Sequence, residues 1–322
     1  MNELNLNDVL LLRPFVNSSY QYFMQWFGEA CERFGMEFVV PPSIPWKIRL
    51  AVAKFGLSFK LPEIVCSRKI LVVPCGGYPD SFAFPLAYTH EIIPVLWDTW
   101  PRYHERIVKS FIRHNVRLAF FTQRQVAEMI QLRLPQVHCV WLPEGIKTSC
   151  YQSGDRLDRR TIDLLELGRL LPRFHSAVKG GSFSHRFKEP SEGLLFKDFS
   201  SLCAGLSDAK ITVCFPRCDT HPDQAGNIET LTQRYWECML SRTVILGRCP
   251  KELFDFLGFN PVVDVDWDNP CEQVEQMVAH IKDYQNTVDR NYEVALAKAS
   301  WDVRMPMMQA QIQMARDETG VS

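Results

Sequence analysis

Residues 211–247 read ITVCFPRCDTHPDQAGNIETLTQRYWECMLSRTVILG and carry the clearest structural signal in the chain. The apolar, β-branched run Ile211–Phe215 predicts a buried strand, which Pro216 ends. After a polar loop, apolar residues return at helical spacing from about Thr230, and a second strand is predicted over Thr243–Gly247. A strand, a helix and a strand in this order form a βαβ unit, so we expect a parallel sheet with helices on its faces.

Two carboxylates lie within this unit, Glu229 in the predicted loop and Glu237 on the helix. In open parallel sheets, ligands bind at the carboxyl ends of the strands, which is where this loop lies. Solvated glutamate pairs are common on surface helices, and this is the alternative interpretation of the two residues. The position of Glu229, after a strand and the loop HPDQAGN, favours a binding site.

Strands and helices alternate along both halves of the chain, which predicts an α/β fold with a largely parallel sheet in each half. The polar run 148–160 interrupts the alternation. The predicted domains are therefore residues 1–152 and 153–302, followed by a final helix over 303–322. A cleft between two such domains would be the natural place for an active site. The predicted strands are 69–74, 92–97, 118–122, 138–142, 162–167, 211–215, 243–247 and 261–266, and the predicted helices include 101–114, 123–132 and 251–257.

Composition narrows the class of protein. The chain has 322 residues, 46% of them hydrophobic, and a net charge of −1, which excludes a strongly basic nucleic-acid binder. Its 11 cysteines are scattered without a CxxC motif, as expected of reduced core residues. The first residues show no signal-peptide pattern and no apolar run reaches transmembrane length, so we expect a cytoplasmic location.

A basic stretch lies at residues 46–69, where Lys and Arg alternate with aromatic and aliphatic side chains. Such a pattern either lies on an anionic membrane surface or forms an ordinary amphipathic helix with a solvated basic face. Peripheral contact with the inner face of a membrane is therefore one prediction for this stretch.

The Glu229-x7-Glu237 pattern, the Gly168-Arg169 turn after the strand at 162–167 and Ser300-Trp301 before the last helix together resemble the retaining, nucleotide-sugar-dependent glycosyltransferases of GT-B fold. The resemblance spans the second domain in its motifs and the first only in its architecture. It implies two Rossmann-like domains facing across a cleft, with the last helix crossing back to the first domain. The implied reaction moves a hexose-type sugar from a nucleoside diphosphate to a hydroxyl of a glycan or lipid-linked acceptor, as in polysaccharide biosynthesis, with retention.

The resemblance assigns roles to the glutamate pair. Glu229 would contact hydroxyls of the donor sugar, and Glu237 would accept hydrogen bonds from the nucleotide ribose. The amides of Thr230, Leu231 and Thr232 would bind sugar and phosphate, in agreement with the affinity of a helix N-terminus for anions. The family has a glycine-containing turn after the first glutamate, and this chain departs from it here.

The family also places a basic pair after the first strand of the second domain, where it neutralises the leaving diphosphate. Arg169 and Arg173 are the candidates, with Lys179 in reserve, although the family's pair is an Arg followed by a Lys. Fixed cations beside a leaving group that gains charge lower the barrier. The resemblance implies that no metal is needed, and the donor is the only small molecule expected besides the acceptor.

Further candidates lie on loops. Gly76-Gly77 follows a strand and either lets the backbone approach the donor phosphate or forms a plain turn. Asp98 and His104 follow the next strand, where they would orient or deprotonate the acceptor hydroxyl; helix capping and a surface histidine are the alternative. Arg217 lies on the loop before Glu229 and would touch donor or acceptor.

Other chemistries find less support in the sequence. Asp264-Val265-Asp266 matches the DxD metal motif of GT-A glycosyltransferases but lies too late in the chain for that fold. No His or Cys cluster has metal-ligand spacing, and neither GxGxxG nor GxxxxGK[ST] occurs. Two alternative functions stay open, a sugar-nucleotide epimerase of similar fold and a non-catalytic GT-B-like protein that binds a sugar nucleotide or a glycan.

Overall fold

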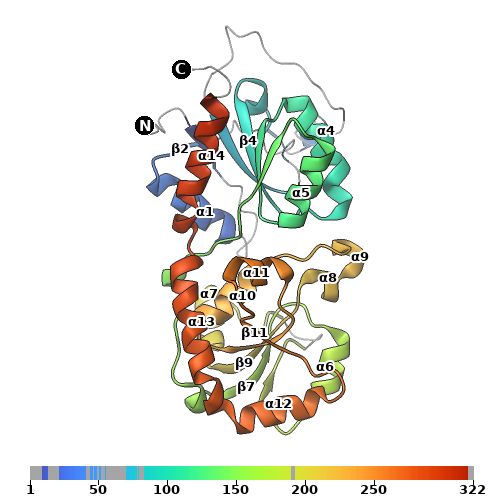
Figure 1. Ribbon diagram of the computed structural model, residues 1–322, viewed down its shortest axis with the longest axis vertical. Coiled ribbons are helices and arrows are strands. Elements are labelled where there is room, and N and C mark those ends of the chain that lie inside the picture. Colours follow the sequence, from blue (N-terminus) through green and yellow to red (C-terminus); the bar gives the residue numbers. More distant parts are fainter. Residues whose placement is uncertain are drawn as a thin grey trace. The chain divides into compact units, whose positions relative to one another are not determined.

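The computed structural model describes residues 9–13, 22–40, 44–45, 47–48, 51, 55, 70–77, 79, 83–189 and 193–317. The chain divides into two compact units, a first unit of Met1–Pro143 with Trp301–Ser322 and a second unit of Glu144–Ser300 (Figure 1). The boundary predicted at residues 152 and 153 therefore falls inside the second unit. The basic stretch 46–69 lies almost entirely outside the described residues, so membrane contact there stays a prediction.

The first unit is built on a six-stranded parallel sheet in the order β2-β1-β3-β4-β5-β6. The strands are β1 (Val9–Leu12), β2 (Glu37–Val39), β3 (Ile70–Gly76), β4 (Glu91–Trp97), β5 (Leu118–Phe121) and β6 (His138–Trp141). The longer helices are α1 (Tyr22–Arg33), α4 (His104–His114), α5 (Arg124–Arg133) and α14 (Met305–Asp317). The central strands β3, β4 and β5 are buried along almost their whole length, which is why they read as continuous apolar runs.

The last part of the chain belongs to the first unit. Helix α14 packs against β5, and Trp301 lies just before it. The Trp301 ring makes edge contacts with Phe27 of α1 and Trp97 of β4, at centroid distances of 5.1 and 5.8 Å. These buried aromatic contacts attach residues 301–317 to the first sheet, as expected for a last helix that crosses back.

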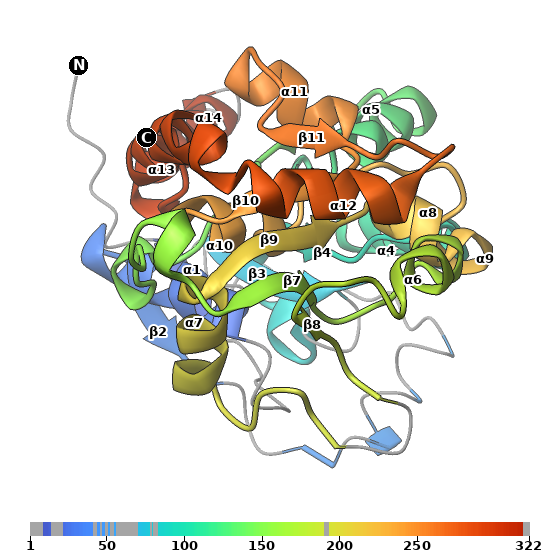
Figure 2. The same ribbon diagram turned by 90° about the horizontal axis from the view of Figure 1, so that it is seen from below.

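The second unit is built on a five-stranded parallel sheet in the order β11-β10-β9-β7-β8 (Figure 2). The strands are β7 (Ile162–Glu166), β8 (His185–Arg186), β9 (Ala209–Cys214), β10 (Val244–Gly247) and β11 (Val262–Asp264). The helices are α6 (Pro172–Val178), α7 (Phe199–Ser207), α8 (Arg217–Thr220), α9 (Pro222–Ala225), α10 (Gln233–Leu240), α11 (Lys251–Leu257), α12 (Pro270–Ala279) and α13 (Gln285–Lys298).

Helices cover both faces of this second sheet. Ile211 and Val213 of β9 point into a core that α6 and α12 complete with Phe174 and Met277. The alternate residue Cys214 points to the other face, where its Sγ lies 3.6 Å from Cys238 Sγ of α10. Because side chains alternate along a strand, a strand covered on both faces is apolar throughout, and this explains the run Ile211–Phe215.

Arg160 attaches the polar run 148–160, where the domain boundary is predicted, to the second sheet. This guanidinium is buried and donates to the carbonyl oxygens of Ser153, Asp155, Ala209 and Ser241 at 2.9–3.0 Å. Burial lowers the pKa of Arg160 to about 10. The run looks like a linker in sequence because it is polar, but one buried side chain makes it part of the second unit.

The predicted strands and helices match the described elements to within a few residues, and α11 matches its predicted range. Helix α10 begins at Gln233 rather than near Thr230, since Thr232 is extended. The strands β1, β2 and β8 were not predicted; they have four, three and two residues and give little periodic signal. Within the described residues, no helix is both long enough and apolar enough to cross a bilayer.

Candidate functional site

In the second sheet, the direction in which successive strands are added reverses between β7 and β9. The chain leaves β7 for β8 on one side and then returns to β9 on the other. In open α/β sheets, ligands bind outside the carboxyl ends of the strands at such a switch point. Arg169 follows β7 and Arg217 follows β9. The topology therefore brings two of the predicted site residues to the edge where a ligand is expected.

Glu229 lies in the loop between α9 and α10, and its side chain is 25% exposed. Its Oε1 pairs with a guanidinium nitrogen of Arg248, and its Oε2 accepts a hydrogen bond from the Lys251 amide at 2.8 Å. The amide belongs to the first residue of α11, so the positive end of that helix adds to the attraction. The carboxylate is thereby held in one orientation.

Arg248 links Glu229 to a second carboxylate. It follows β10 directly, and its Nε and Nη2 donate to the two oxygens of Asp219 at 2.6 and 2.7 Å. The hydrogen bonds that Arg248 donates to Asp219, and then to Glu229, raise the pKa of its guanidinium, which is charged at any working pH. Its backbone carbonyl accepts the Tyr235 hydroxyl at 2.7 Å. Arg248 is not among the residues that the sequence predicts for the site, although its place right after a predicted strand is a usable signal.

Glu237 lies on α10 and is almost fully buried, with 6% of the residue exposed. Its carboxylate forms an ion pair with Arg234 at 2.5 Å and accepts the Tyr151 hydroxyl at 3.0 Å. Burial, and then the Glu237 carboxylate, raise the pKa of Tyr151 well above its usual value. Glu237 is thus no solvated surface glutamate, which removes the alternative interpretation of this residue.

The backbone after Glu229 differs from the prediction at one position. The amide of Leu231 donates to the buried carboxylate of Glu252 on α11, at 3.0 Å. This amide was expected to bind the donor, and it is instead part of the fold. Thr232 is the N-cap residue of α10, whereas Thr230 is buried in the segment before the helix; contacts of either residue with a ligand stay predictions.

The predicted cations of the leaving-group site are exposed. Arg169 lies in the turn after β7, and Arg173 lies in the first turn of α6. The Arg173 guanidinium stacks 4.3 Å above the Trp267 ring, which in turn stacks on Phe215 after β9. Lys179 follows the far end of α6 and pairs with Glu189 at 3.8 Å. Because α6 runs away from the carboxyl edge, Lys179 is the weakest of the three candidates.

Arg217 is the first residue of α8, and its Nη2 donates to Gln224 at 2.6 Å. This bond closes the short segment between β9 and Glu229. The side chain is partly exposed, so a ligand contact by Arg217 stays a prediction.

In the first unit, packing and backbone conformation account for the second glycine of the predicted pair, Gly77. Gly76 ends β3, and Gly77 has φ of +83°, which favours glycine. A Cβ on Gly77 would lie 3.3 Å from the ring of Tyr103, and its amide donates to the Trp97 carbonyl at 2.9 Å. The plain-turn interpretation therefore accounts for Gly77 without a phosphate.

The two acceptor-side candidates behave differently. Asp98 is exposed directly after β4, at a φ of +51°. His104 is buried at the start of α4, and its Nε2 bonds the Thr99 carbonyl at 2.9 Å. Burial lowers the pKa of His104 below its ordinary value. The prediction that His104 is a general base is therefore disfavoured, and so is the alternative of a surface histidine, because the ring is packed into the fold.

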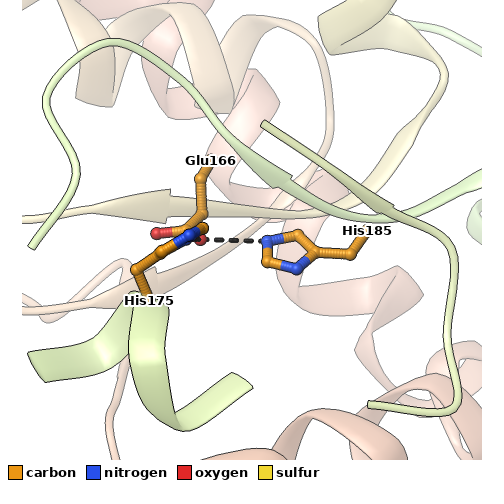
Figure 3. Close-up of side chains that lie close together, drawn as sticks. All are labelled: Glu166, His175 and His185. Carbon is orange, nitrogen blue, oxygen red and sulfur yellow. Dashed lines mark hydrogen bonds and ion pairs between the residues drawn. The ribbon is translucent and has the colours of Figure 1, made fainter. Parts of the chain in front are cut away.

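One cluster of possible metal ligands comes together in space without any metal-ligand spacing in the sequence. Glu166, His175 and His185 lie side by side at the end of β7 (Figure 3). Among the described residues, these three form the one group of His, Cys, Asp or Glu side chains that could hold a metal ion. Asp264 and Asp266 do not belong to it. His175 lies 9 positions after Glu166, and His185 lies 10 positions after His175. These intervals match no metal-ligand motif, so the sequence gives no signal of a metal site.

No protein-family profile and no curated protein matches the chain by sequence. Solved structures do match it. HepE from Anabaena, in complex with UDP and glucose, has a TM-score of 0.60 at 7% identity over 95% of this chain and 99% of its own. Sucrose-phosphate synthase from Thermosynechococcus elongatus has a TM-score of 0.59 at 12% identity over 98% of this chain and 99% of its own.

TarM is a third similar structure, with a TM-score of 0.51 at 11% identity over 74% of this chain. This chain spans 53% of TarM, about half of its length. At such identities the likeness concerns the fold. The chain has the GT-B class of α/β fold, with two Rossmann-like units.

Proposed function

We propose that this chain is a glycosyltransferase that moves a hexose-type sugar from a nucleoside diphosphate to a hydroxyl of a glycan or lipid-linked acceptor, with retention and without a catalytic metal. The observation that carries the proposal is the network of Glu229, Arg248 and Asp219 beside the carboxyl edge of the second sheet. HepE, a protein of the same fold, was solved with UDP and glucose, which supports a sugar nucleotide as donor.

On the donor side, Glu229 would bind hydroxyls of the transferred sugar. Its orientation is fixed by Arg248 and by the Lys251 amide, so little freedom is lost when the sugar binds. Glu237 would bind the ribose. Only 8% of the Glu237 side chain is exposed. Ribose binding therefore requires Tyr151 or Arg234 to share the Glu237 carboxylate with the ribose hydroxyls.

The leaving diphosphate would be neutralised by Arg169 and Arg173. Both are exposed in the segment that follows β7, so both can turn toward a ligand at the switch point. Cations placed where negative charge develops stabilise the transition state more than the ground state. The stack of Arg173 on Trp267 holds one of the two guanidinium groups in place beforehand.

On the acceptor side, Asp98 is the better candidate, since His104 is buried and bonded to Thr99. Asp98 would orient the acceptor hydroxyl or take its proton. Replacing it by Asn should lower transfer to the acceptor and leave donor binding unchanged. A parallel loss in both would contradict this role.

The proposal is tested by a panel of UDP-, GDP- and TDP-sugars. We expect one nucleotide class to raise the Tm of the protein, because a ligand that binds only the folded state stabilises it. Nucleotide release should then be faster with an acceptor than without. Glu229→Gln should reduce turnover, while Glu293→Gln, an exposed residue of α13, should not.

The other outcomes separate the alternatives. Isomerised sugar nucleotide formed without acceptor would identify an epimerase. Binding without any turnover over a range of acceptors would identify a non-catalytic binding protein. A Tm that no nucleoside diphosphate changes would refute the sugar-nucleotide proposal altogether.

A further inference from the structure

Three side chains from three elements converge at the end of β7. Glu166 is the last residue of that strand, His175 lies on α6 and His185 on β8, and Figure 3 shows both rings pointing at the carboxylate. His175 Nδ1 lies 2.6 Å and His185 Nε2 lies 2.9 Å from the same oxygen, Glu166 Oε1. One ligand atom from each residue lies within 4.8 Å of the others.

We propose that Glu166, His175 and His185 bind a divalent transition metal, with zinc as the preferred ion. Two imidazoles and one carboxylate form a donor set that zinc uses, with a fourth position for water. Magnesium and calcium prefer sites made of oxygen alone, so the two ring nitrogens argue against them. The proposal is independent of the sugar-nucleotide chemistry above.

The electrostatics of the cluster favour a cation. Glu166 is 2% exposed, and a buried ionised carboxylate is costly unless a positive charge or hydrogen bonds compensate it. An imidazole supplies a hydrogen bond in either form, but a charge only when it is protonated. In the described residues, Glu166 Oε2 and His185 Nδ1 are also buried with no hydrogen-bond partner. A buried carboxylate oxygen without a hydrogen-bond partner calls for an explanation. A metal ion bound to this group would supply the missing partner.

The two separations from Glu166 Oε1 need only a small adjustment, and the two ring nitrogens lie within 4.8 Å of each other. Zinc lies about 2.0–2.2 Å from nitrogen and oxygen ligands, so ligand atoms in a tetrahedral site are about 3.3 Å apart. The separations of 2.6 and 2.9 Å would widen by about half an ångström. Phe187 lies against both rings, at 4.6 Å from each centroid, and limits their rotation. The His175 side chain is 16% exposed, which gives an ion a way in.

The bound ion would stabilise short elements. Strand β8 has two residues and α6 has seven, so neither forms by itself. A metal would join both to β7 directly before Gly168-Arg169. The bound ion would therefore hold this corner of the second unit together.

The test uses the full chain, stripped with a chelator and titrated with Zn²⁺ and Co²⁺. We expect one zinc per chain and a Tm that rises with zinc. Because cysteines also bind these metals, the Co²⁺ spectrum is the decisive measurement: nitrogen and oxygen ligands give visible bands without thiolate charge transfer. Glu166→Gln and His185→Asn should each weaken binding by more than about 100-fold, because losing a direct ligand costs more than losing an outer-shell contact.

The matched control is His280→Ala, an exposed histidine of the same unit, which should bind zinc as the unchanged protein does. Circular dichroism checks folding, and His175→Asn replaces His185→Asn if the latter does not fold. Zinc that is not retained, a thiolate band in the cobalt spectrum, or equal affinity in the ligand variants and the control would each overturn the proposal and leave a hydrogen-bonded triad.

Discussion

The carboxyl ends of the two sheets carry different chemistry. In the first unit, Gly77 lies against Tyr103, and His104 is buried and bonded to the backbone, so packing explains both. In the second unit, Glu229 and Arg248 are partly exposed and form an ion-pair network. Charged side chains at the second edge are thus accessible to a ligand, as the proposed function requires. At the first edge, Gly77 and His104 are accounted for by the packing of their own unit.

The largest effect is expected at the second edge. Arg169→Ala should lower turnover by about 100- to 1000-fold, because it removes a cation from the leaving diphosphate. The free energy of unfolding should change by less than about 0.5 kcal/mol, since the side chain is exposed. Steady-state kinetics and urea unfolding measure the two quantities. Arg159→Ala, at a side chain that is 67% exposed, is the control, and an equal loss in both variants would break the comparison.

Glu237→Gln should destabilise the protein by about 2 kcal/mol, because it removes the charge partner of the Arg234 guanidinium, whose side chain is only 27% exposed. Urea unfolding gives the free energy, and Glu293→Gln should leave it near the unchanged value. A loss below about 1 kcal/mol would show that solvent, not Glu237, compensates Arg234. The result would sharpen the contrast between the buried Glu237 and the partly exposed Glu229.

Gly77→Ala should cost about 1–2 kcal/mol of stability, because a φ of +83° is unfavourable for alanine. Gly258→Ala is a matched variant, since its φ is +80° and nothing lies within 4 Å of a Cβ there. The difference between the two losses, measured by thermal unfolding, reports the contact with Tyr103. If Gly77→Ala instead weakened nucleotide binding without destabilising the fold, the first edge would join the ligand site.

The smallest effect concerns pH. Burial lowers the pKa of His104 in the folded state, so below its ordinary pKa of about 6.5 the unfolded chain takes up a proton that the folded protein does not. Stability should therefore fall as the pH drops below about 6.5, until the folded pKa is reached. We expect His104→Gln to show a shallower decline of the unfolding free energy between pH 7 and 5. Identical pH profiles would mean that His104 is not buried in its neutral form.

The sequence predicts structure best where a single continuous segment contains all the residues that form the element. The run Ile211–Phe215 predicted β9 because both faces of that strand are buried, and the Glu229–Glu237 spacing marked the loop and helix beside it. The links that orient Glu229 could not be read in this way. Arg248 and Asp219 lie on different elements, and only the parallel pairing of β9 with β10 brings their segments together.

The same limit applies to side chains that meet across elements. The Leu231 amide meets the Glu252 carboxylate 21 residues away, which no local pattern encodes. Glu166, His175 and His185 come from a strand, a helix and a second strand. Helical or strand periodicity describes one element at a time, so convergence of this kind appears only once the elements are packed.

The return of residues 301–317 to the first sheet makes the first unit discontinuous in sequence. The second unit is one continuous segment, Glu144–Ser300, so all of its strands are synthesised before α14 is. Until then the first unit lacks Trp301, and the rings of Phe27 and Trp97 stay partly uncovered. Since domains fold as units during synthesis, we expect the first unit, although its strands β1–β6 are made first, to be completed last.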